Sequence, residues 1–150
     1  MLESLNAVTT FLLIRHGSND YLGKILAGQL EGIHLNAKGG EQARELARTL
    51  ANLPIAAIYS SPRERARETA FPLSQDLRIP ITVEDGLEEV DFGQWTGMTT
   101  TELEKIPAWG NLDHLRSCIR PPDGEHILEV QQRMVQALEK LAARHPSAMV

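Results

Sequence analysis

One histidine and two arginines stand where they could act together on a phosphate group. His16 and Arg15 directly follow the apolar run 11–14, and Arg65 comes shortly after the run 55–59. A neutral imidazole can attack phosphorus through one ring nitrogen, provided that the other nitrogen donates to a backbone carbonyl. An arginine fork binds two phosphate oxygens at once, whereas lysine offers only a point charge. The residue types therefore indicate a site for phosphoryl chemistry.

The leaving oxygen of a phosphate ester also needs a proton. Several carboxyl groups that could supply it follow residues 79–83, a candidate strand. Glu88, Glu89 and Asp91 all lie just after the run 79–83. A carboxyl beside a bound phosphate would have its pKa raised by like charge, which suits a general acid. The residues alone leave open which of the three donates the proton.

The same residues also have an ordinary structural interpretation. A lone Arg-His pair at the end of a strand is most often a surface feature. The charged series 63–68 is typical of a solvated helix face with ion pairs between residues four apart. The order and the context of the motifs must decide between the two interpretations.

Apolar patterns predict the elements that would position these side chains. Continuous apolar runs at 11–14 and 55–59 are typical of short strands buried on both faces. Residues 79–83 are a third, shorter strand candidate, since Pro80 is tolerated at the start of a strand. Helical periodicity and capping residues predict helices between and after the strands. The expected helices start after Asn36, after a capping box from Ser61 to Glu64 with Pro62 at the first helical position, and after Thr99, and the last spans 127–144.

Strands that alternate with helices favour a parallel α/β sheet. Such sheets bind ligands beyond the carboxyl ends of their strands, where His16 and the start of the second helix fall. Residues 107–124 hold three prolines and two glycines and predict a mobile flap.

Composition indicates one globular domain over residues 1–150. Of these residues 42% are apolar, which is enough for a single core. Cys118 is the only cysteine, so an intrachain disulfide is excluded and the cytoplasm is the expected location. A net charge of −5 argues against nucleic acid or an anionic membrane as the main partner. No apolar run approaches the ~18 residues of a membrane span.

Three ordered motifs resemble the histidine phosphatase superfamily, in its phosphoglycerate mutase-like branch. They read Phe-Leu-Leu-Ile-Arg-His-Gly at 11–17, Ser-Ser-Pro-Arg-Glu-Arg-Ala-Arg-Glu-Thr-Ala at 60–70 and Leu-Glu-Glu-Val-Asp-Phe-Gly-Gln-Trp-Thr-Gly at 87–97. With shorter matches between and after them, the resemblance covers roughly residues 11–146. It implies a three-layer α/β/α sandwich with a mostly parallel sheet, incomplete at its C-terminal part.

The resemblance also implies a role for each matching residue. His16 would be the nucleophile that becomes phosphohistidine, and Glu89 rather than Glu88 would be the proton donor. Arg15 and Arg65 would bind the phosphoryl group. The implied substrate is a small phosphorylated metabolite, and the implied chemistry uses no metal and no cofactor.

One departure from the family pattern leaves the substrate class open. Mutase-type members often carry an asparagine five residues after the glycine of the first motif, and here that position is Leu22. Ser18, Asn19 and Gly28 are therefore the candidate substrate-binding residues of this loop. Phosphate ester hydrolysis is favoured over phosphoglycerate mutase-type transfer, because a mutase asks for a closed and strongly cationic pocket.

A second departure concerns the family's second catalytic histidine, which lies in a His-Gly motif soon after the last helix. The chain ends at Val150 before any such motif. We expect a truncated piece of a longer chain, in which Ala148–Val150 opens a further strand. Apolar edges exposed by such a gap favour aggregation or a homodimer. The alternative function is a non-catalytic phosphate-binding module.

Overall fold

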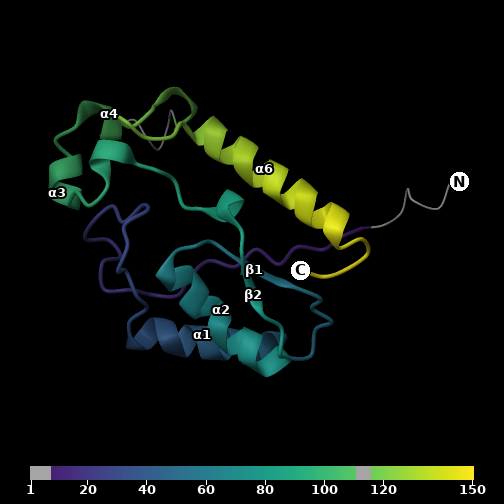
Figure 1. Ribbon diagram of the computed structural model, residues 1–150. Coiled ribbons are helices and arrows are strands. Elements are labelled where there is room, and N and C mark those ends of the chain that lie inside the picture. Colours follow the sequence, from purple (N-terminus) through teal and green to yellow (C-terminus); the bar gives the residue numbers. More distant parts are fainter. Residues whose placement is uncertain (1–7, 111–115) are drawn as a thin grey trace, which may run out of the picture.

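The structure is a computed structural model that describes residues 8–110 and 116–150. It consists of short parallel strand segments between two layers of helices (Figure 1). The longer elements are α1 (Ala37–Leu50), β1 (Ile58–Ser60), α2 (Glu64–Leu77), β2 (Ile81–Val83) and α6 (Ile127–Arg144). The short helical turns are η2 (Asp85–Leu87), η3 (Gly93–Trp95), α3 (Thr100–Leu103), α4 (Pro107–Gly110) and η4 (Arg116–Cys118).

The sheet is parallel throughout. β1 pairs with β2 so that Ile58 lies opposite Ile81. Met149 forms parallel bridges to Thr10 on one side and to Ile55 on the other. The segments therefore lie in the order 10–12, 148–150, 55–60 and 81–83, with the end of the described chain between the first segment and β1.

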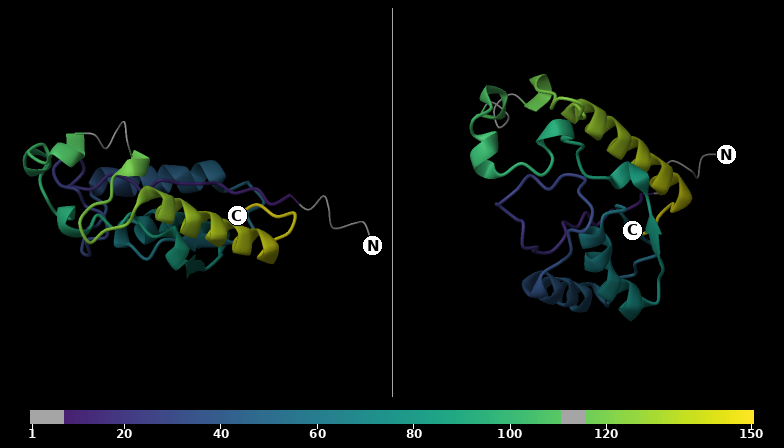
Figure 2. Two further views of the ribbon diagram at one scale, coloured as in Figure 1. Left: turned by 90° about the horizontal axis from the view of Figure 1, so that it is seen from above. Right: turned by 60° about the vertical axis from the view of Figure 1, so that its left-hand side comes forward.

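Helices cover both faces of this sheet, as the sequence predicts. α1 and α2 pack against each other, and α2 contacts both strands. α6 crosses the opposite face, as two different views show (Figures 1 and 2). The core between the sheet and the helix pair is built around Ala47, Ile58 and Leu73. This is the expected three-layer α/β/α arrangement.

The prediction that the run 11–14 is a strand buried on both faces is wrong for this chain. The amide of Leu12 donates to the carbonyl of Val150 over 2.8 Å, and this is its last ladder bond among the described residues. Leu13 is 74% exposed. Neighbouring strands help to cover the side chains of a strand, and among the described residues this run makes no backbone hydrogen bond to a neighbouring strand beyond Leu12.

Helix starts were predicted well where one local cap decides them. Asn36 accepts from the amide of Gly39 at the start of α1. Thr99 and Glu102 form both halves of a capping box at α3. The capping box predicted from Ser61 is wrong, because α2 begins at Glu64 without a side-chain cap. The hydroxyl of Ser61 accepts from the amide of Arg63 over 3.3 Å and donates to Glu88, a carboxylate from a distant loop.

The flap predicted at 107–124 contains α4 and η4, while its residues 111–115 lie outside the described part. Trp109 of α4 stands edge-on to the buried Trp95, with ring centroids 5.9 Å apart. This contact joins the start of the flap to η3. None of the helices within 8–110 and 116–150 is long and apolar enough to cross a membrane.

Two adjacent glycines in the first turns of α1 should respond oppositely to alanine. A Cβ at Gly39 would overlap the carbonyl oxygen of Ser18, whereas one at Gly40 meets only the end of the Arg44 side chain at 3.5 Å. We expect Gly39→Ala to destabilise the protein by about 1–3 kcal/mol. Gly40→Ala should stabilise it by up to about 1 kcal/mol, because alanine favours the helix. Urea unfolding of both variants measures the difference, and equal shifts would contradict the close contact.

Candidate active site

His16 follows the extended run 11–14 and is half-buried. Its Nδ1 lies 2.8 Å from the carbonyl oxygen of Gly17. Because a carbonyl only accepts, the neutral ring must carry its proton on Nδ1, which leaves the lone pair on Nε2. This is the hydrogen bond that the sequence predicts for a nucleophilic histidine.

The peptide that orients His16 is itself held by α2. The amide of Gly17 donates to Thr69 Oγ1 over 3.0 Å, and that hydroxyl donates to the carbonyl of Arg65 over 2.7 Å. Gly17 also packs on α1, since a Cβ there would lie 2.7 Å from the carbonyl oxygen of Gly39. The histidine loop is therefore tied to the same helical turn that carries Arg65.

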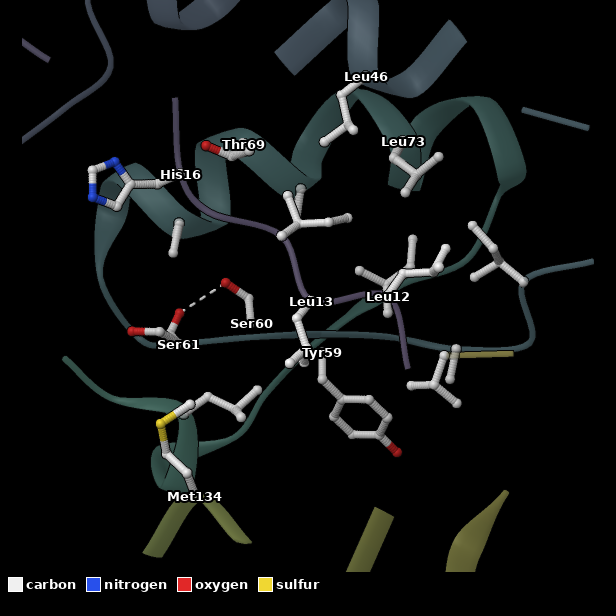
Figure 3. A pocket seen from close by; sticks show the side chains of 18 residues that line it. Leu12, Leu13, His16, Leu46, Tyr59, Ser60, Ser61, Thr69, Leu73 and Met134 are labelled. Carbon is white, nitrogen blue, oxygen red and sulfur yellow. Dashed lines mark hydrogen bonds between the residues drawn. The ribbon is translucent and has the colours of Figure 1, made fainter. Parts of the chain in front are cut away.

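A cavity of about 270 Å³ extends from His16 along the sheet. Figure 3 shows His16, Ser61 and Thr69 toward one end, and leucine side chains that include Leu12 and Leu73 toward the other. The end beside His16 is polar, whereas most of the remaining wall is apolar.

Arg65 lies in the first turn of α2 and is only 2% exposed. Its Nη2 donates to the carbonyl of Gly28 over 2.7 Å and lies 3.9 Å from Glu89 Oε2. Its Nη1 is buried without a hydrogen-bond partner in the described structure. Buried charges are normally fully satisfied. An unsatisfied guanidinium at a helix start is well suited to bind an anion.

The other predicted contact residues occupy different surroundings. Arg15 is exposed beside His16. Ser18 accepts from the amide of Asn36 through its carbonyl, and the buried Asn19 accepts from the amide of Tyr21. Gly28 has a left-handed φ of 46° and directs its carbonyl at Arg65. Ser18, Asn19 and Gly28 thus shape the loop, and their contact with substrate stays a prediction.

The structure distinguishes the three carboxylates that the sequence left open. Glu88 is 13% exposed, pairs with Arg63 Nη2 at 2.9 Å and accepts from the Ser61 hydroxyl. Asp91 accepts from the amide of Gly93. The Glu89 side chain is 41% exposed and accepts from the amide of Val90. Among the three, Glu89 is the one beside Arg65 that also remains open to a ligand.

The interpretation of residues 63–68 as a solvated helix face is wrong. Glu64 accepts from the amide of Gly32, and this hydrogen bond holds the pKa of Glu64 below its usual value. Glu68 accepts from the amide of Leu35 and pairs with His34. The hydrogen bond to Glu68 raises the pKa of His34. These carboxylates fasten the loop 31–35 over the start of α2, and periodicity alone could not show contacts across more than thirty residues of sequence.

The remaining described histidines have partners away from His16. His34 pairs with Glu68, His126 caps α6, and His145 Nε2 lies 2.9 Å from the hydroxyl of Tyr59. His114 lies outside the described residues. Within the part that the structure describes, no three His, Cys, Asp or Glu side chains gather as a metal site would require.

The fold and the site define an α/β protein whose histidine loop is tied by hydrogen bonds to the helical turn of a buried arginine. The sequence profile of the histidine phosphatase superfamily (branch 1) matches residues 11–150, and the chain belongs to this family. Its fold is similar to that of YhfR from Bacillus stearothermophilus, with a TM-score of 0.89, 31% identity and coverage of 95% of this chain and 72% of that one. It is also similar to mycobacterial glucosyl-3-phosphoglycerate phosphatase Rv2419c, with a TM-score of 0.81, 27% identity and coverage of 93% and 65%.

Curated relatives agree with this assignment. Phosphoserine phosphatase 1 of Hydrogenobacter thermophilus is 29% identical over 144 residues, which cover 89% of this chain and 64% of the relative. The bifunctional protein Rv2228c of Mycobacterium tuberculosis is 32% identical over 144 residues, covering 95% and 40%. The chain thus spans less than two thirds of the length of these two relatives.

Proposed function

We propose that this protein is a phosphomonoesterase that hydrolyses a small phosphorylated metabolite through a phosphohistidine at His16. The observation that carries the proposal is the buried Arg65 guanidinium with an unpartnered Nη1, on the same helical turn that orients the His16 loop. A phosphate monoester would satisfy this cation and bring its phosphorus to His16. The family and the phosphatases among its relatives support the same chemistry.

The proposed reaction has two steps. In the first, His16 Nε2 attacks phosphorus, the ester P–O bond breaks, and the leaving oxygen takes a proton from the Glu89 carboxyl. In the second, Glu89 removes a proton from water as that water attacks phosphorus, and the P–N bond breaks to release phosphate. Arg15 and Arg65 balance the negative charge that spreads over the phosphoryl oxygens in both steps.

Hydrolysis is favoured over transfer between two phosphorylated ligands. Glu89 is 41% exposed, so water has a direct path to the acid that would activate it against the phosphoenzyme. A mutase must exclude water from that intermediate. The single cysteine and the net charge of −5 agree with a cytoplasmic enzyme whose substrate is a small anion held locally.

The proposal is tested by two measurements on the same preparation. Release of inorganic phosphate is followed over a panel of aryl and alkyl phosphate monoesters, and binding of inorganic phosphate is measured by calorimetry. We expect both turnover and binding. Phosphate binding without turnover would instead indicate a phosphate-binding module, and the absence of both would refute the anion site itself.

Replacement of the proposed acid should separate substrates by their leaving groups. Glu89→Gln cannot donate a proton, so we expect kcat/KM for an alkyl phosphate to fall by about 10²–10⁴-fold. Aryl phosphates with acidic phenols need little protonation and should be affected far less. Asp91→Asn is the matched control, because it removes one charge from the same loop and keeps an oxygen for the amide of Gly93. Equal losses of Glu89→Gln on both substrate types would remove Glu89 from the acid role.

A further inference from the structure

One arginine of α6 directs most of its hydrogen bonds into the loop that carries Glu89. Arg133 Nη1 donates to the carbonyls of Gly86 and Glu88, over 3.1 and 2.7 Å. Its Nη2 donates to the carbonyl of Glu89 over 3.0 Å. Residues 86–91, here named the acid loop, thus present three carbonyls to one guanidinium.

A carboxylate from outside the acid loop holds this guanidinium in place. Glu125 accepts from Arg133 Nε and Nη2 over 2.8 and 2.9 Å, in the two-pronged geometry that suits arginine. The Glu125 carboxylate also accepts from the amide of Asp91, and the backbone amide of Glu125 donates to the Asp91 carbonyl. The hydrogen bond from Arg133 holds the pKa of Glu125 below its usual value. Arg133 therefore binds the start of the acid loop at Gly86, and Glu125 binds its end at Asp91.

Arginine suits this position better than lysine does. The acid loop begins inside η2 and forms no strand, so these three carbonyls need donors from elsewhere. A guanidinium supplies five N–H groups in a fixed plane, whereas lysine supplies three on a point charge. The loop also lies directly on α6, since a Cβ at Gly86 would come 2.6 Å from the Cβ of Ala137, one helical turn beyond Arg133.

Backbone hydrogen bonds of the acid loop set the position of the Glu89 side chain. Its backbone carbonyl accepts from Arg133 Nη2 and from Gln29 Nε2, and its amide donates to Glu88 Oε1 over 2.7 Å. The backbone of Glu89 is thus fixed on both sides while its carboxylate stays open, 3.9 Å from Arg65. The hydrogen bond of Arg133 to Glu89 is made to the backbone carbonyl, and its positive charge also acts on the Glu88 and Glu89 carboxylates.

We propose that Arg133, locked by Glu125, is a positioning residue that sets the proton donor Glu89 against the phosphate site. The assignment rests on the proposed function for the role of Glu89. The ordering of the acid loop by Arg133 does not, and it can be measured without turnover.

Hydrogen–deuterium exchange of the whole chain tests the ordering. In Arg133→Met the aliphatic stem remains while the donors are lost, and we expect the amides of the acid loop to exchange about tenfold faster or more. Exchange in α1 and α2 should stay as in the wild type. Arg48→Met is the matched control, because Arg48 forms an exposed pair with Glu45 on α1, away from the acid loop. Unchanged exchange at 86–91 in a folded Arg133→Met would overturn the proposal.

Steady-state kinetics tests the effect on the acid. Since a misplacement of about 1 Å can cost on the order of 100-fold, we expect Arg133→Met to lower kcat for an alkyl phosphate by about 10–100-fold, with KM and aryl phosphate turnover little changed. Arg133→Lys should recover only a small part of the loss. Equal losses on both substrate types would show a merely structural role and overturn the proposal.

Misfolding of the variant, and failure of the proposed function, can each be distinguished from failure of the Arg133 proposal. If Arg133→Met does not fold, Glu125→Gln preserves the shape of the pair and removes its charge, and the same exchange and kinetic changes are expected with smaller size. If the wild type hydrolyses no monoester, the proposed function fails, while the exchange data still decide whether Arg133 orders the acid loop.

Discussion

Replacing His16 by alanine is expected to abolish phosphate ester hydrolysis, with a loss of about 10⁴-fold or more in kcat/KM, because the covalent route disappears with its nucleophile. The fold should remain intact. The side chain is only half-buried, and its hydrogen bond to the adjacent Gly17 ties it to no distant element. Rates on an aryl phosphate, together with thermal unfolding by circular dichroism, measure both parts of the prediction.

A second histidine provides the control for this substitution. His126 caps α6 through Nδ1, which accepts from the amide of Leu128, and asparagine is a favourable residue at that position. His126→Asn should therefore keep both stability and turnover. Undiminished hydrolysis in His16→Ala would exclude a phosphohistidine at this residue.

Replacing Arg65 by methionine should lower activity without lowering stability. We expect a loss of about 3–4 kcal/mol in transition-state stabilisation, which corresponds to about 10²–10³-fold in kcat/KM, and a parallel loss of inorganic phosphate binding. Stability should stay level or rise, because the substitution removes a buried cation whose Nη1 is unsatisfied. The carboxylate of Glu89, which lies 3.9 Å from Arg65, is exposed to water and stays solvated when the guanidinium is removed.

The control for Arg65 lies on the same helix. Arg67 is exposed on α2, so Arg67→Met removes the same charge and leaves the buried site unchanged. We expect it to resemble the wild type in turnover and in calorimetric phosphate affinity. Retained phosphate affinity in Arg65→Met, or an equal loss in Arg67→Met, would show that bulk charge rather than the buried guanidinium binds the anion.

Much of the fold follows from local signals in the sequence. The cap at Asn36, the capping box at Thr99 and the spacing in 127–144 predicted α1, α3 and α6, because each depends on residues within a few positions of one another. The burial of the run 11–14 could not be predicted in this way. A strand is buried by segments that are distant in sequence, and among the described residues this run makes its last ladder hydrogen bond at Leu12, while Leu13 is 74% exposed.

In the candidate site, too, contacts between neighbouring residues could be predicted from the sequence, whereas contacts between distant segments could not. The bond from His16 to the Gly17 carbonyl joins neighbouring residues, and the chemistry of a nucleophilic imidazole required it. The pairs Arg63 with Glu88 and Arg133 with the acid loop join segments that are far apart in sequence. Their residue types are those of any exposed helix face, so only the three-dimensional structure assigns them a task. Of the three carboxylates, it leaves Glu89 beside the buried cation.

Trapping of the covalent intermediate tests the central claim most directly. The protein is mixed with an aryl phosphate, quenched within the first turnovers under alkaline denaturing conditions, and digested for mass spectrometry. The proposed mechanism predicts one phosphoryl group on the peptide that contains His16, stable to alkali, labile to acid and absent from His16→Ala. Turnover that leaves this peptide unmodified, or an acid-stable phosphate on a hydroxyl side chain, would contradict it.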